Sequence, residues 1–103
     1  MSVLKITKSN FESVVLSSDK PVLLDLYANW CGPCKMLSPI IESIADEHPE
    51  YLVGKINVDE EGELARKFRV MSIPMLVVMR DGDVVETAVG YRTKENILEL
   101  LED

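Results

Sequence analysis

The sequence has few of the residues on which several classes of protein depend. Aromatic residues make up 6% of the 103 residues, and there are only two cysteines and one histidine. No apolar run approaches the length of a membrane-spanning helix, so we expect no membrane partner. The first residues contain no long apolar stretch of the kind found in secretory signal peptides. We therefore expect a soluble, cytoplasmic protein.

Basic residues are also too few to favour binding to nucleic acid. Eleven Lys and Arg stand against eighteen Asp and Glu, which gives a net charge of −7. An acidic chain repels the phosphate backbone, so we expect no nucleic-acid partner. The acidic residues are spread along the chain, as is typical of solvated helix faces.

What remains is the composition of an ordinary globular protein. Hydrophobic residues make up 47% and charged residues 28% of the chain. A chain of this length can bury a core without disulfides or metals. Because we find no repeat, linker or low-complexity segment, we expect residues 1–103 to form a single domain. We also expect the protein to be a monomer.

Strand and helix patterns alternate along the chain. The strands that we expect lie at 3–7, 21–27, 51–59, 75–79 and 84–89, and the helices begin near Ser9, Cys34, Glu60 and Thr93. Ser9 and Glu12 have the spacing of a capping box, and Asp59 is placed to cap the helix at 60–68. The order βαβαβαββα requires parallel strands early and an antiparallel hairpin late. We therefore predict a three-layer α/β/α fold with a mixed central five-stranded sheet.

Both cysteines lie in Y-A-N-W-C-G-P-C-K, residues 27–35. A permanent structural disulfide between Cys31 and Cys34 would close a very short loop and so stabilise the fold little. The cytoplasm also disfavours permanent disulfides. A zinc site would need two further ligands, and the single His48 lies at the far end of the predicted helix. We expect no metal, although a site that bridges two copies of the chain stays open. Haem attachment would need a histidine where Lys35 stands.

A redox-active pair explains more of the motif. The pair follows a buried strand and begins a helix, so Cys31 falls near the N-cap, where free N–H groups and the helix dipole favour a sulfur anion. A lowered thiol pKa raises the reactive fraction at neutral pH. Gly32 lets a client chain approach closely, and Pro33 suits a first helical turn. We therefore interpret Cys31 and Cys34 as a pair that makes and breaks its own bond.

W-C-G-P-C-K resembles the active site of the thioredoxin family, and the resemblance extends along the whole chain. The further matches are Asp25 six residues before Cys31, Pro39 five after Cys34, Ile73-Pro74 before the late hairpin, and Val89-Gly90 after it. The resemblance implies the thioredoxin fold and a protein-disulfide reductase that acts on client proteins and carries electrons. It also implies a flavin-dependent thioredoxin reductase as partner, with NADPH as the indirect source of electrons. The chain has no Gly-rich nucleotide loop, so we expect it to bind no cofactor itself.

The resemblance also assigns roles around the cysteines. Asp25 interrupts an apolar strand, so we expect it to be buried with a raised pKa. The family implies that it accepts the proton of Cys34, through water, and that Lys55 lies beside it and adjusts its charge. A lysine that merely reaches solvent is the alternative for Lys55.

The family further implies a client-binding surface. Trp30, Ile73, Pro74 and Gly90 are its expected residues, with the Ile73–Pro74 bond cis and packed against the cysteines. The Ile73 backbone is suited to pair with an extended client chain. Val58 and Val89 are equally compatible with this surface and with the core.

The sequence departs from the family's commonest pattern at two positions. Tyr27 and Met75 stand where Trp and Thr are frequent, so client preference and redox potential are not fixed by the resemblance. An oxidase or isomerase is one alternative function, disfavoured by Gly-Pro between the cysteines and by the lack of a secretory signal. A non-catalytic binding subunit that uses the surface around Trp30 and Pro74 is the other.

Overall fold

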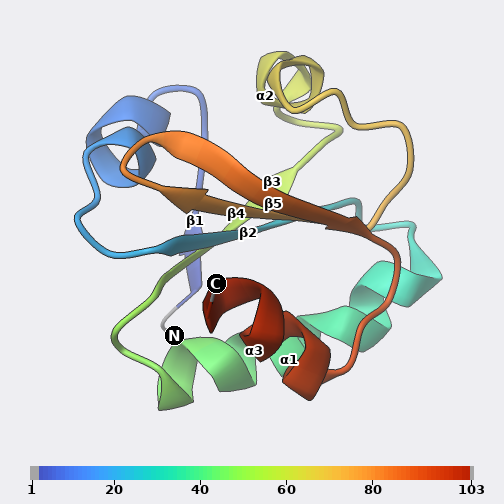
Figure 1. Cartoon of the computed structure of the whole chain (residues 1–103). Helices are drawn as coiled ribbons and strands as arrows, with labels where there is room; N and C mark the ends of the chain where they lie inside the picture. The colour runs from blue at the N-terminus through green and yellow to red at the C-terminus, as the bar shows by residue number, and fades with distance from the viewer. Residues whose placement is uncertain (1–2, 103) are drawn as a thin grey trace.

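A computed structural model describes residues 3–102 and has the predicted α/β architecture. The strands are β1 (Val3–Lys5), β2 (Val22–Tyr27), β3 (Leu52–Asn57), β4 (Met75–Arg80) and β5 (Asp83–Val89), in the sheet order β1-β3-β2-β4-β5. β1, β3 and β2 are parallel, whereas β4 is antiparallel to both β2 and β5. The helices are η1 (Phe11–Leu16, a π-helix), α1 (Gly32–Glu47), α2 (Gly62–Lys67) and α3 (Lys94–Glu102). η1 and α2 cover one face of the sheet and α1 and α3 the other (Figure 1).

The central strand β2 is buried on both faces, as its near-continuous apolar run predicts. Leu24 and Leu26 belong to the apolar cluster that contains residues of η1 and α2. Leu23 belongs to the cluster that contains residues of α1 and α3. Because successive side chains of a strand point to opposite faces, Asp25 lies on the same face as Leu23, towards α1.

Ile6, just after β1, packs so closely against Gly54 of β3 that no side chain fits at this position. An added Cβ would lie 2.6 Å from Cγ1 of Ile6, a fully buried side chain just after β1. The first strand and the segment after it can therefore lie tightly against the centre of the sheet.

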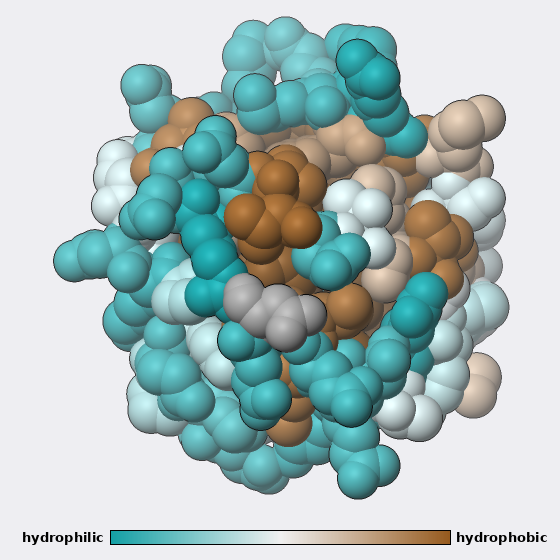
Figure 2. Space-filling view, viewed as in Figure 1, coloured by the Kyte–Doolittle hydropathy of each residue, from teal (hydrophilic) through white to brown (hydrophobic). Residues whose placement is uncertain are grey.

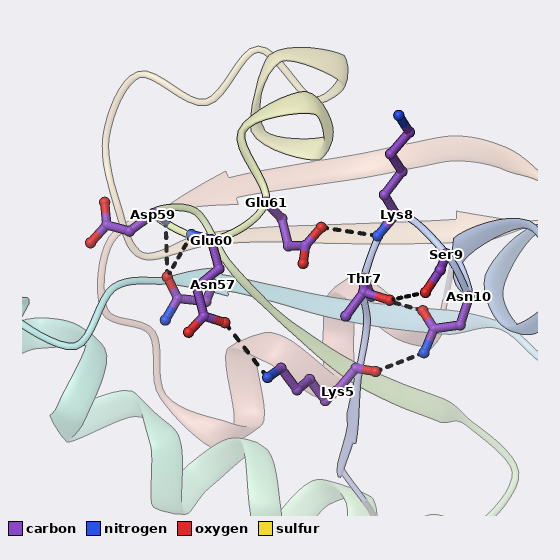
Figure 3. Close-up of polar contacts among 9 residues, drawn as sticks. All are labelled: Lys5, Thr7, Lys8, Ser9, Asn10, Asn57, Asp59, Glu60 and Glu61. Atoms are coloured by element: carbon purple, nitrogen blue, oxygen red, sulfur yellow. Dashed lines mark hydrogen bonds and ion pairs between the residues drawn. The ribbon is translucent and has the colours of Figure 1, made fainter.

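The prediction of a capping box at Ser9 and Glu12 is wrong, because the helix has Asn10 at its N-cap and no side chain caps it. The side chain of Asn10 accepts a hydrogen bond from the Thr7 N–H at 2.8 Å and donates to the Lys5 carbonyl at 2.9 Å, while the Ser9 hydroxyl pairs with that of Thr7 (Figure 3). Asn10 thus closes a turn directly after β1. As a result β1 ends at Lys5, and the helix begins only at Phe11.

The short helix α2 begins later than expected and ends in a Schellman motif. The N–H of Val70 bonds to the carbonyl of Ala65 and that of Arg69 to the carbonyl of Arg66, both at 3.0 Å. This motif requires a left-handed residue after the helix, and Arg69 has a φ of 55°. Glycine is the usual residue at that position, so the sequence gives no sign of it.

The late hairpin and the last helix agree with the sequence. Asp81 and Gly82 both have positive φ, 53° and 84°, as a two-residue turn between antiparallel strands requires. The Thr93 hydroxyl accepts the N–H of Asn96 at 3.2 Å and so caps α3.

Apolar surface gathers over β5, whose Val84 and Val85 are exposed (Figure 2). Within residues 3–102, no helix has the length and apolar character needed to cross a membrane.

Candidate redox site at the carboxyl end of the central strand

The two cysteines lie where β2 passes into α1. Cys31 occupies the N-cap of α1 in an extended conformation, and its sulfur accepts the backbone N–H of Cys34 at 3.2 Å. The two residues form a disulfide, with Cα atoms 5.3 Å apart, so this is the oxidised protein. Their exposed fractions are 5% and 3%. Gly32 and Pro33 between them are exposed, so the short loop that joins the two cysteines faces solvent.

This geometry favours a thiolate at Cys31 once the bond is reduced. The first backbone N–H groups of a helix have no partner within the helix, and the positive end of the dipole lies there. A sulfur at the N-cap that already accepts one such N–H is therefore stabilised as an anion. Pro33 lies in the first turn of α1, where its missing donor breaks no helical bond.

Asp25 lies beneath the cysteines in a low-dielectric position. Its side chain is 5% exposed, and its Oδ1 has no hydrogen-bond partner in the described part of the chain. Burial raises the pKa of this carboxyl to about 7, and the charge of Lys55 opposes part of the rise. Lys55 is the register partner of Asp25 on β3 and is half-buried. The expected juxtaposition of these two residues is therefore present.

A cavity of about 250 Å³ joins Asp25 to Cys34. Its walls also include Lys55 and, from residues that the sequence did not single out for this role, Tyr27, Ala28, Asn29, Lys35 and Ser38. A carboxyl that changes protonation near neutral pH thus shares a space with the second cysteine. This arrangement suits transfer of a proton between them.

Three loops meet on the opposite side of Cys31. The Ile73–Pro74 bond is cis, as the family resemblance implied, and the Ile73 carbonyl oxygen lies 3.9 Å from the Cys31 sulfur. Gly90, with a φ of 93°, donates its N–H to the Pro74 carbonyl at 2.8 Å. Trp30 is 71% exposed, while Pro74 is buried. Trp30 directly precedes Cys31 and Ile73 contacts its sulfur, and the bond between Pro74 and Gly90 joins the other two expected client-binding residues to this loop.

Asp59 does not cap α2, contrary to the sequence prediction. α2 begins at Gly62 after Glu61, and the Asp59 carboxylate instead accepts the indole N–H of Trp30 at 2.8 Å. The Asn57 carboxamide oxygen accepts the N–H groups of Asp59 and Glu60 at 2.9 and 3.4 Å and so shapes the loop that presents Asp59 (Figure 3). The sequence could have indicated this contact, because the parallel strands β2 and β3 end side by side and so bring the residues that follow each strand together.

The N-terminal segment holds this loop from the other side. Lys5 pairs with Glu60 at 3.6 Å, and the backbone N–H of Lys8 donates to Glu61 at 2.9 Å (Figure 3). The Lys8 ammonium pairs with Glu63 at 2.5 Å. Because the side chains of both ion pairs are exposed, each pair stabilises the protein little, and their effect is to orient the loop.

An apolar groove of about 520 Å³ adjoins Trp30 on the side of this loop. It is lined by Trp30, Val58, Ala65, Val70, Met71, Ser72 and Ile73. The sequence pointed to Trp30 and Ile73, and left Val58 open, but it did not single out Val70 or Met71. Within residues 3–102, no three His, Cys, Asp or Glu side chains lie close enough together to hold a metal ion.

Comparisons with known proteins agree with one another. A family model described as Thioredoxin matches residues 2–103. The chain is 47% identical over 103 residues to a thioredoxin of Mycobacterium tuberculosis, covering 99% of this chain and 89% of that protein. It is 46% identical over 102 residues to a thioredoxin of Bacillus subtilis, covering 98% and 96%. A solved mutant thioredoxin from Halobacterium salinarum is similar with a TM-score of 0.90 at 37% identity, covering 98% of this chain and 88% of that one.

Proposed function

The chain belongs to the thioredoxin family and is a thiol-disulfide oxidoreductase, and from that premise we propose how its own residues reduce a client disulfide. The observation that carries the proposal is the position of Cys31, whose sulfur lies at the N-cap of α1 and accepts the Cys34 N–H. In this proposal Cys31 is the nucleophile, Cys34 the resolving thiol and Asp25 the proton acceptor.

In the first step the Cys31 thiolate attacks one sulfur of the client disulfide. A bond forms between Cys31 and that sulfur, the client's own S–S bond breaks, and the other client sulfur leaves as a thiolate and is protonated. The Ile73 backbone, 3.9 Å from the Cys31 sulfur, and the exposed Trp30 are suited to hold the client during this attack.

In the second step Cys34 loses its proton to ionised Asp25 through the shared cavity. The Cys34 sulfur attacks Cys31, the mixed bond breaks, and the client leaves with both of its sulfurs reduced. The two electrons come from the dithiol, which becomes the Cys31–Cys34 disulfide. A carboxyl with a pKa of about 7 is suited to this step, because it is partly ionised at neutral pH and can both take and return a proton.

Single-cysteine variants test the assignment. Cys34→Ser should capture a disulfide-containing client as a stable mixed disulfide, because the resolving thiol is missing, and Cys31→Ser should capture none. Neither variant should accelerate insulin reduction by dithiothreitol above the background rate. Equal capture by both variants would mean that Cys31 is not the specific nucleophile.

Thioredoxins act in general on disulfide-containing proteins and are returned to the dithiol by a partner reductase. We propose that the partner here is a flavin-dependent thioredoxin reductase fed by NADPH. We also propose that residues 1–103 act as a single-domain monomer in the cytoplasm, a compartment in which thiols are kept reduced. Equilibration of the cysteine pair with glutathione tests the direction of the reaction, since a potential more oxidising than the cytosolic glutathione pool would favour an oxidase.

A further inference from the structure

The apolar groove beside Trp30 continues, away from the disulfide, into a hollow bordered by two arginines. This second hollow has a volume of about 320 Å³ and is lined by Ala65, Arg66, Arg69, Val70 and Met71. Three of these residues, Ala65, Val70 and Met71, also line the groove at Trp30. One continuous surface therefore leads from the client-binding side of the redox site to the arginines.

The apolar part of this surface is unusually open to solvent. Met71 is 96% exposed and Trp30 71% exposed. Neither residue belongs to the buried core, and methionine adapts its shape readily to varied partners. The position and character of both side chains fit contact with the flexible stretch of a client chain.

Arg69 is held in a conformation that an arginine adopts at a cost. Its φ of 55° lies in the left-handed region, at the position of a Schellman motif where glycine is unstrained. Its guanidinium makes no ion pair or side-chain hydrogen bond with the other described residues. Backbone strain at non-glycine residues is found disproportionately at functional sites, and this guanidinium is free to pair with a group from outside the protein.

The charged residues along the surface differ between its two ends. At the Trp30 end, the Asp59 carboxylate accepts a hydrogen bond from the indole N–H of Trp30. Arg66 interacts with Glu63 and also complements the dipole at the end of α2, so it has a structural role. Arg69 lies beyond the helix and has neither explanation. In a chain of net charge −7, the far end of the groove therefore offers a local positive charge to an incoming group.

We propose that Arg69 receives an acidic side chain of the extended client stretch that flanks the disulfide and lies along this surface. The inference rests on the proposed reductase function and adds to it a preference among clients. The apolar residues of the client lie along Val70 and Met71, and its Asp or Glu side chain pairs with the guanidinium of Arg69.

The test compares matched peptides in reduction by the full-length dithiol protein. Each peptide carries one cysteine in disulfide linkage to a chromogenic thiol, with Glu or Gln placed in turn at each position on either side of the cysteine. At low salt, we expect one region of the peptide where Glu raises kcat/KM by about two- to fivefold over Gln, as befits an exposed ion pair. Added salt should remove the difference.

Variants of the protein separate this pairing from a general charge effect. Arg69→Gln should abolish the preference for Glu without slowing the Gln peptides, and Arg69→Lys should retain most of it. Lys20→Gln makes the same change in net charge at the opposite end of β2, where Lys20 binds the Pro49 carbonyl, and should leave the preference unchanged.

The outcomes distinguish this inference from the function on which it rests. Equal kcat/KM for Glu and Gln peptides at every position, or equal loss of the preference in Arg69→Gln and Lys20→Gln, would overturn the pairing and leave the reductase intact. Failure to reduce any of the peptides, together with failure to reduce insulin, would overturn the reductase itself.

Discussion

Replacement of Asp25 by asparagine is expected to stabilise the oxidised protein at neutral and alkaline pH. The carboxyl is 5% exposed, and burial raises its pKa from an ordinary value of 3.8 to about 7. Each pKa unit corresponds to about 1.4 kcal/mol, so holding this group ionised in the folded protein lowers the free energy of unfolding by roughly 4 kcal/mol. Asparagine has nearly the same shape without the charge, so the variant should escape most of this penalty.

The direction of the pH dependence follows from the same pKa values. Between about pH 4 and about pH 7 the folded protein retains a proton that the unfolded chain releases, so the unfolded state binds fewer protons. The contribution of protonated Asp25 to stability is therefore fully present below about pH 4 and is lost as the pH rises to about 7. The advantage of Asp25→Asn should grow over that range and stay constant above it.

Urea unfolding of the oxidised wild type and variant at about pH 4, pH 5.5, pH 7 and pH 8.5 measures this difference. Asp83→Asn, at an exposed position at the start of β5, provides a matched control and should change stability by less than about 0.5 kcal/mol. An advantage of Asp25→Asn that is the same at every pH, or below about 1 kcal/mol at pH 8.5, would show that the pKa of Asp25 is not raised as its burial requires.

The same substitution should impair the second step of catalysis. Without a carboxylate in the cavity, Cys34 loses its proton more slowly, so the mixed disulfide should persist longer after a rapid mix with client. Quenched-flow measurement of client release reports this directly. Release rates that equal those of the wild type across the pH range would remove Asp25 from the mechanism while leaving its effect on stability.

Three further substitutions test features of the fold and the site. Asp59→Ala removes the hydrogen-bond acceptor of the Trp30 indole. Because Trp30 is the only tryptophan, the fluorescence emission should shift while the far-ultraviolet circular dichroism stays unchanged. An unaltered emission spectrum would mean that the hydrogen bond does not form in solution. Arg69→Gly should raise the free energy of unfolding by about 1 kcal/mol, since it relieves the left-handed strain, and a loss of stability in urea would contradict that reasoning. Gly54→Ala should lower it by roughly 1–3 kcal/mol, because the added methyl group overlaps Ile6, and a neutral result would show that the neighbouring chain moves aside easily.

Sequence patterns predicted the architecture where each residue's environment was set by local periodicity. The run V-L-L-D-L in β2 indicated a strand covered on both faces, and the acid within it indicated a buried carboxyl. The placement of the cysteine pair between that strand and a helix indicated the N-cap position of Cys31. The cis bond before Pro74 came from the family resemblance, since nothing in the local pattern distinguishes it from a trans bond.

The predictions that were wrong concern side chains with a choice of partners. Ser9 and Glu12 have the spacing of a cap, but Asn10 competes by bonding to Thr7 and Lys5 and so delays the start of the helix. Asp59 has the identity of a cap, but its partner is Trp30, 29 positions away in the sequence. Local spacing cannot report such a partner, because the contact exists only once β2 and β3 lie side by side.

The redox bond joins residues only three apart, both within the first turn of one helix. Neither of the two large apolar clusters includes either cysteine, so we expect the packing of the sheet against its helices to change little when the bond is reduced. Opening and closing it should therefore move few atoms outside the first turn of α1. Such a molecule can pass through many cycles of electron transfer with little reorganisation, and each turnover begins from the same shape.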